Sequence, residues 1–243
     1  MVLRQLTKGI IYYSDLRPNP EILRVCQEHL LKASKGLPIV SCTLKPINFG
    51  KNIVLENRER SYPTMLKQIV MALEALDTDV VFFTEHDVLY NETHFEFTPP
   101  TDHIYYYNIN NWRWFITEDF AVTYDGLHSL SGLCCNRKLA LKHFTDRLNY
   151  VEAKGWDKER SREPRWGRVM GYEPGTKPRR RGGFTDETFE VWKSEKCNID
   201  LRHKNTFSAP KVRLADFKHK PENWREEKIE NIPDWDLKNL WKK

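Results

Sequence analysis

The most constraining feature of this chain is an alternation of short apolar runs with helical patterns in its first third. The segments between the runs keep apolar residues at helical spacing, and each follows a good cap residue, Asn19 or Ser61. Continuous apolar runs that alternate with helices predict parallel strands covered on both faces and joined by right-handed crossovers. We therefore expect a Rossmann-like α/β domain whose strands include residues 9–14, 37–44 and 79–83.

The sequence changes in texture after residue 103. Short aromatic segments follow, which favour an antiparallel or mixed extension of the sheet, and then a helix from about Arg137 to Glu152. Residues 154–181 are rich in basic residues, Gly and Pro and predict a loop. We expect one catalytic domain over 1–204 and a C-terminal arm over 205–243 that packs on it.

Composition narrows the class of protein. Aromatic residues make up 12% of the 243 residues, which excludes a mainly disordered chain. The apolar runs are too short to span a membrane, and the start lacks a signal-peptide pattern, so we expect a soluble protein in the cytoplasm of a bacterium or of a phage-infected host. Five cysteines without a CxxC pair argue against a disulfide framework or a zinc ribbon, and the vicinal pair Cys134-Cys135 is expected to pack as small apolar residues.

Two acidic residues, Glu85 and Asp87, directly follow the apolar run at 79–83. Ligands of Rossmann-like folds bind beyond the carboxyl ends of the strands, and carboxylate oxygens suit Mg²⁺ or Mn²⁺ bridging phosphate groups. The pair therefore predicts a site for a diphosphate. The alternative is that both are solvated turn residues.

The pair resembles the Asp-x-Asp motif of GT-A glycosyltransferases, and longer strings are similar to a bacterial and phage group of GT-A-like proteins. The resemblance covers most of residues 9–207 and implies a transferase that uses a nucleotide sugar, with a UDP-sugar favoured, and Mn²⁺ or Mg²⁺. It also implies a metal set of Glu85, Asp87 and His203, in which the longer Glu85 contacts metal-bound water or the sugar. The literal motif Asp77-Thr78-Asp79 precedes its strand and is expected at the wrong end of the sheet. The matching strings are IIYYSD, PINFGKNIVL, YPTMLKQIVMALEAL, FFTEHDVLYNETHFEF and NIDLRHKNTF.

A nucleotide-sugar donor would place its base and ribose against the ends of the first strands. Tyrosine can stack on a base, and Asp15 can accept from ribose hydroxyls. The structural alternative is that one tyrosine is core and that Asp15 only turns the chain. The donor-binding residues expected are Tyr12, Tyr13, Ser14, Asp15, Arg17 and His86, with Arg58 and Lys67 as cations for the diphosphate.

An inverting transferase also needs a carboxylate that deprotonates the acceptor hydroxyl. The segment Gly182-Gly183-Phe184-Thr185-Asp186-Glu187 resembles the acidic motif that carries this base, and Asp186 is ranked ahead of Glu187. The segment also fits a helix start with Thr185 as cap. Residues 131–137 resemble the small-residue loop that lines the sugar pocket of this fold.

Charge suggests the acceptor. Residues 137–243 carry 27 basic and 18 acidic side chains, and 154–181 alone carry ten against four. Basic residues with interleaved aromatics favour DNA, and the favoured acceptor is a 5-hydroxymethylpyrimidine in DNA. Alternatives are a surface-glycan or lipid-linked acceptor, a nonenzymatic DNA-binding module and a nucleotidyltransferase. The acceptor-side residues expected are Trp112, Trp114, Trp166, Lys177, Arg179, Arg180 and Arg181.

Overall fold

The computed structural model describes residues 5–155, 173–176, 186–206 and 211–241. Its main sheet has seven strands in the order β10-β6-β9-β4-β1-β2-β3, and only β9 runs antiparallel to its neighbours. The strands are β1 (Lys8–Ser14), β2 (Ile39–Thr43), β3 (Lys51–Val54), β4 (Val80–Glu85), β6 (Ile104–Asn108), β9 (Leu133–Asn136) and β10 (Thr188–Trp192).

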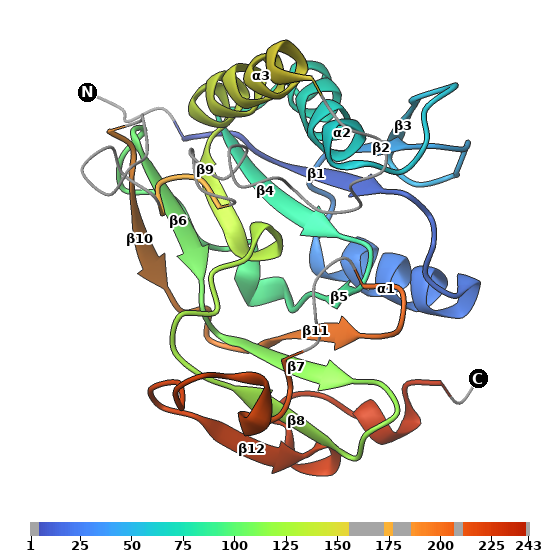
Figure 1. Cartoon of the computed structure of the whole chain (residues 1–243), viewed down its shortest axis with the longest axis vertical. Helices are drawn as coiled ribbons and strands as arrows, with labels where there is room; N and C mark the ends of the chain where they lie inside the picture. Colours follow the sequence, from blue (N-terminus) through green and yellow to red (C-terminus); the bar gives the residue numbers. More distant parts are fainter. Residues whose placement is uncertain (1–4, 156–172, 177–185, 207–210, 242–243) are drawn as a thin grey trace.

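Three helices cover this sheet. Helices α2 (Tyr62–Ala75) and α3 (Arg137–Lys154) lie side by side on one face, and α1 (Pro20–Ala33) lies on the other (Figure 1). The predicted caps are present, since Asn19 Oδ1 accepts from the Glu21 amide at 2.9 Å and Ser61 Oγ from the Thr64 amide at 3.2 Å. The predicted α/β class, with a mostly parallel sheet between helices, is confirmed.

Strand β3 was not predicted from the sequence, because its residues follow a polar loop and are only partly buried. It pairs parallel to β2 although only residues 44–50 connect the two strands, whereas parallel neighbours usually need a long crossover. Gly50 makes the tight return possible: its φ is +61°, and a Cβ there would lie 2.5 Å from the Ile39 carbonyl oxygen.

A second, mixed sheet of five strands lies below the first, in the order β12-β8-β7-β11-β5 (Figure 1). It is the extension expected from the aromatic segments. Only β7 and β11 pair in parallel, and the other pairings are antiparallel. Its strands are β5 (Val88–Leu89), β7 (Asn111–Phe115), β8 (Phe120–Thr123), β11 (Asn198–Arg202) and β12 (Arg225–Lys228).

The C-terminal segment is part of this second unit. Strand β12 pairs with β8, and the buried side chains of Ile232 and Leu237 join a core formed by the second sheet and α1. Short 3₁₀ turns complete the described chain at Glu92–His94, Leu130–Gly132, Leu214–Asp216, Ile229–Asn231 and Leu237–Asn239. No helix among the described residues is long and apolar enough to cross a membrane.

Candidate active site

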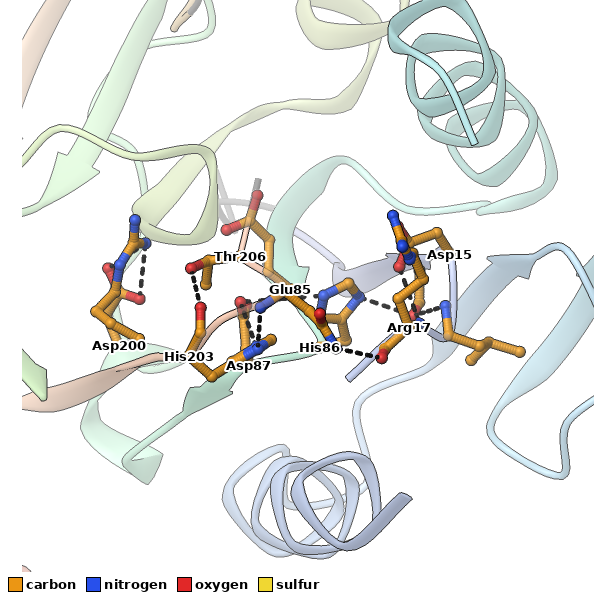
Figure 2. A network of polar contacts seen from close by, with 12 residues as sticks. Asp15, Arg17, Glu85, His86, Asp87, Asp200, His203 and Thr206 are labelled. Atoms are coloured by element: carbon orange, nitrogen blue, oxygen red, sulfur yellow. Dashed lines mark hydrogen bonds and ion pairs between the residues drawn. The ribbon is translucent and has the colours of Figure 1, made fainter. Parts of the chain in front are cut away.

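The two sheets meet where β4 ends. Asp87 lies in the turn between β4 and β5, and its carbonyl oxygen accepts a 2.8 Å hydrogen bond from the Leu201 amide in β11. Asp200 pairs with Val88 in the adjoining ladder. This register brings the end of β11, and with it His203, to the acidic end of β4, as Figure 2 shows. Asp87 and His203 therefore lie close together, as the resemblance implied, although 116 positions separate them in the sequence.

Asp87 is buried and faces two imidazoles. Its Oδ2 lies 3.5 Å from His203 Nε2 and 4.0 Å from His86 Nε2 (Figure 2). Burial acts to raise the pKa of this carboxyl, but His86, His203 and Arg202 outweigh it and the pKa is lowered. Asp87 is thus ionised and already surrounded by positive or proton-donating groups.

Glu85 has a different environment from Asp87. Tyr13 Oη donates to its Oε1 at 2.7 Å, and its amide donates to Tyr90 Oη at 3.1 Å. Burial, and next the negative charge of Asp87, raise the pKa of Glu85. The raised pKa of Glu85 shows that these two neighbouring carboxylates do not ionise easily together, and a divalent cation would supply the further positive charge.

A third carboxylate, the buried Asp200, lies beside this pair. Arg202 Nη1 donates to both of its oxygens at 3.2 and 3.3 Å, and Arg113 Nε lies 3.3 Å from Oδ2. Arg113 Nη1 also donates to Tyr124 Oη at 2.5 Å. Arg113 and Arg202 therefore counter the charges of Asp200 and Asp87, and Glu85 adds a further negative charge only in its ionised form, which its raised pKa disfavours.

Sequence reasoning missed Asp200, Arg113 and Arg202. Asp200 and Arg202 occupy alternate positions of β11 and so point to one face. That alternation was readable from the sequence. The pairing of β11 with β7, which brings Arg113 opposite Asp200, was not.

The end of β1 contributes to the same region. Ser14 Oγ lies 2.7 Å from His86 Nδ1, and Asp15 pairs with Arg60 at 2.5 Å. The carbonyl of Arg17 accepts a 3.2 Å hydrogen bond from the Asn205 side chain, which ties this loop to the His203 loop. The structure therefore brings Tyr13, Ser14, Asp15 and Arg17 to the acidic strand end, and their role in binding the donor stays a prediction.

Other donor-site expectations need correction. Tyr12 is buried against Phe49, with ring centroids 4.8 Å apart, and its hydroxyl accepts from Gln27, so its ring is core and not a stacking surface for a base. The cation that reaches Asp15 is Arg60, whereas Arg58 is exposed and Lys67 half-buried.

Gln68 is a further residue that the sequence reasoning missed. Its Nε2 donates to the carbonyls of Ser14 and Cys42 at 2.8 and 3.0 Å and so fixes the ends of β1 and β2. A single polar residue on the buried face of a helical pattern was the available signal.

The predicted general base is in the wrong place. Glu187 directly precedes β10, whose first residue, Thr188, pairs with Ile104 at the start of β6. The strand register places Glu187 level with Asp79, six residues before Glu85, which corresponds to about 20 Å along the strand direction. Asp186 is its exposed neighbour and lies at the same distant edge.

At this distant edge the Glu187 carboxylate contacts two side chains of the fold. It accepts from Tyr105 Oη at 2.9 Å and lies 2.6 Å from His143 Nδ1. Burial opposes ionisation, but these two partners outweigh it and lower the pKa of Glu187. Its carboxylate therefore joins β6 to α3.

The acceptor-side tryptophans are also core residues. Trp112 and Trp114 are buried between the second sheet, α1 and the C-terminal segment, so neither offers a ring to an acceptor. The other expected acceptor residues, Trp166, Lys177, Arg179, Arg180 and Arg181, lie outside the described residues.

Several sequence-based expectations are confirmed. Asp79 accepts from the Thr7 amide and hydroxyl at the amino end of β4, so the literal Asp77-Thr78-Asp79 motif lies at the opposite edge from Glu85. The small-residue loop lies near Glu85, because Tyr90 Oη accepts from the Glu85 amide and donates to the Ser131 carbonyl at 3.1 Å, while its role in lining a sugar pocket stays a prediction. All five cysteines are free and buried.

A hollow lined by the described residues lies away from this site. It has a volume of about 750 Å³ and lies at the amino edge of the sheet, beside Lys8 and Asp77. Lys8 Nζ already donates to the carbonyls of Phe95 and Glu96. We place the site by its buried charges and not by the size of this hollow.

No family model and no curated protein matches this chain. Among solved structures it is similar to a glycosyltransferase involved in the glycosylation of the major capsid of PBCV-1, with 9% identity, a TM-score of 0.46, and coverage of 80% of this chain and 93% of that one. It is also similar to a galactosyltransferase, LgtC, with 14% identity, a TM-score of 0.39 and coverage of 74% and 72%. The bifunctional IspDF of Campylobacter jejuni gives 12% identity and a TM-score of 0.35; the match covers 65% of this chain and spans about half, 51%, of that protein. These identities are too low to assign a substrate.

Proposed function

We propose that this protein is a glycosyltransferase that moves a sugar from a nucleotide-sugar donor, with a UDP-sugar favoured, to an acceptor hydroxyl. The observation that carries the proposal is the pair of the partly buried Glu85 and the buried Asp87 at the carboxyl edge of a mostly parallel sheet, where such folds bind their ligands. The sequence resemblance to the GT-A group supports the same reading.

The donor set of the site fits a divalent cation. Glu85 uses one oxygen for the Tyr13 hydroxyl, and Asp87 has one oxygen between two imidazoles, so carboxylate oxygens remain for a cation. No group of three histidine, cysteine or acidic side chains converges as a metal site among the described residues, so the cation would take its remaining ligands from water and phosphate, as Mg²⁺ and Mn²⁺ commonly do. Bound there, it would neutralise the negative charge that develops on the departing nucleoside diphosphate.

The residues of the chain itself prepare the donor site. Tyr13 orients Glu85, and Ser14 orients His86, each through one side-chain hydrogen bond. Arg60 fixes Asp15, which we assign to the ribose hydroxyls. Because burial and the charge of Asp87 raise the pKa of Glu85, a bound cation would also favour its ionised form.

The favoured acceptor remains a 5-hydroxymethylpyrimidine in DNA. The support is the excess of basic residues over 154–181, ten against four, with tryptophans interleaved. Such a segment binds phosphates through its charges and can stack on an unpaired or extruded base. A glycan or lipid-linked acceptor is the competing case.

The donor half of the proposal is tested by hydrolysis and binding. We expect one of a panel of UDP- and GDP-sugars to be hydrolysed with Mn²⁺ or Mg²⁺, and hydrolysis to stop when EDTA is added. Asp87→Asn should abolish this activity, while Asp77→Asn, at the opposite edge, should not. A chain that hydrolyses no nucleotide sugar with either metal would refute the proposal.

The acceptor half is tested by DNA titration at several salt concentrations. Replacing Arg179, Arg180 and Arg181 together by alanine should reduce the slope of log affinity against log salt by up to about three. Donor hydrolysis should be unchanged in this variant. No binding at low salt to duplexes with hydroxymethylated pyrimidines would favour a glycan acceptor.

A further inference from the structure

His203 is held in one orientation by its own loop. The Asn205 amide donates to His203 Nδ1 at 3.3 Å, and the Thr206 amide and hydroxyl both donate to the His203 carbonyl, at 3.0 and 2.5 Å. The side chain is nearly fully buried, with 4% of its surface exposed. These bonds close a tight turn directly after β11, and the turn sets the direction in which the ring points.

The bond at Nδ1 determines where the proton of the neutral ring lies. A nitrogen that accepts from an amide N–H carries no hydrogen of its own, so in neutral His203 the hydrogen is on Nε2. This Nε2 is 3.5 Å from Asp87 Oδ2 and has no properly aligned hydrogen-bond partner among the described residues. A histidine that ligates a metal through Nε2 instead uses Nδ1–H as a donor to its surroundings. The amide of Asn205 stands at the position where that acceptor would be needed.

We propose that His203 is a hydrogen-bond donor that positions Asp87, and not a metal ligand. This inference rests on the proposed function for the presence of the cation and goes beyond it in assigning the cation only carboxylate ligands from the protein, Glu85 and Asp87. An all-oxygen set suits Mg²⁺ as well as Mn²⁺, whereas an imidazole ligand would favour Mn²⁺. The donor role also agrees with the finding that no three histidine, cysteine or acidic side chains among the described residues are arranged to hold a metal ion.

The tautomer can be measured directly in the free protein. Long-range ¹H–¹⁵N correlation spectra of protein labelled with ¹⁵N-histidine distinguish a protonated from an unprotonated ring nitrogen, and the His203 signals are identified by their loss in His203→Gln or, independently, in His203→Asn. We expect Nε2 to carry the hydrogen, before and after addition of Mg²⁺ and UDP. Hydrogen on Nδ1 in the free protein, or its transfer to Nδ1 when Mg²⁺ and UDP are added, would overturn the inference.

Two substitutions separate a donor from a ligand. In His203→Gln the side-chain amide retains an N–H donor near the Nε2 position, while in His203→Glu a carboxylate could ligate a cation but cannot donate. We expect His203→Gln to keep the Mn²⁺ affinity, measured from the free-Mn²⁺ EPR signal, within about threefold, and to keep more turnover than His203→Glu. A tenfold or greater loss of Mn²⁺ affinity in His203→Gln, with affinity retained in His203→Glu, would show that His203 is a ligand.

The two proposals fail in different ways. If wild-type protein binds neither Mn²⁺ nor Mg²⁺, the metal in the proposed function is refuted, and the NMR spectrum of the free protein still decides the tautomer of His203. If the protein binds metal and hydrolyses a donor but His203 carries its hydrogen on Nδ1, only the present inference is refuted.

Discussion

His94 gives a stability prediction whose size follows from its surroundings. It is fully buried where the two sheets join, and its Nδ1 accepts from the side-chain amides of Asn108 at 2.9 Å and Asn198 at 3.2 Å. Its Nε2 is buried without a hydrogen-bond partner among the described residues. Burial lowers the pKa of His94 to about 3. The ring therefore stays neutral in the folded protein well below the pH at which it protonates in the unfolded chain.

The sign and size of the effect follow from linkage. The unfolded pKa is about 6.5, so the contribution of neutral His94 is fully present above that pH and is lost progressively as pH falls from about 6.5 toward 3. Each pH unit in this window costs about 1.4 kcal/mol, so this one residue should lower the free energy of unfolding by about 2 kcal/mol between pH 7 and pH 5.

The measurement is urea unfolding at pH 7, 6 and 5, followed by tryptophan fluorescence. His94→Asn removes the titrating group and places an amide oxygen near the Nδ1 position, where Asn108 and Asn198 can still donate. We expect this variant to be less stable at pH 7 but to lose about 2 kcal/mol less than the wild type on acidification. His103→Asn is the matched control, because His103 is 72% exposed and should leave the pH dependence unchanged. Equal losses in His94→Asn and the wild type would refute the reasoning.

Three further predictions concern the site and its surroundings. In calorimetric titrations of UDP with Mn²⁺, Asp87→Ala should abolish metal-dependent binding and Asp77→Ala should not. The same binding result for both variants would refute a site at the carboxyl edge of the sheet. Asp186→Asn should leave turnover within about threefold of wild type, because the residue lies about 20 Å along the sheet from Glu85; a loss of two orders of magnitude would restore it as the general base. Glu187→Gln should lower the free energy of unfolding at pH 7 by about 1–3 kcal/mol in urea titrations, and the difference from wild type should shrink as pH falls below about 4.3, because the lowered pKa makes the ionised form the stabilising one. A difference that grows in acid would contradict it.

The elements that the sequence predicted well are those with a strong local pattern. Strands β1, β2 and β4 are continuous apolar runs, α1 and α2 have both a periodic apolar face and a cap, and all five were predicted. Strand β3 lies at the sheet edge, and only its last two residues, Ile53 and Val54, are apolar. This pattern is too short to predict a strand.

The site residues likewise were predicted where a local pattern marks them and were missed where they depend on strand pairing. Glu85 and Asp87 were found because they follow a buried strand, but Arg113 reaches the site only through the pairing of β7 with β11. The two tryptophans of β7 were assigned to an acceptor because the sequence does not show which face of the sheet is buried. Trp112 and Trp114 lie on the face packed on α1, and Arg113 lies on the opposite face.

The junction of the two sheets has a consequence for the order of folding. Asp87 meets Leu201 and His203 only after β11 has paired beside β5, so the site depends on contacts between residues that are more than a hundred positions apart. Such distant contacts carry a high loop-closure cost and tend to form late. The main sheet can acquire its parallel core before the candidate site exists, and hydrogen exchange started during refolding should protect the amides of β1 and β4 before that of Leu201. We therefore expect the proposed activity to report complete folding more sensitively than helix content does.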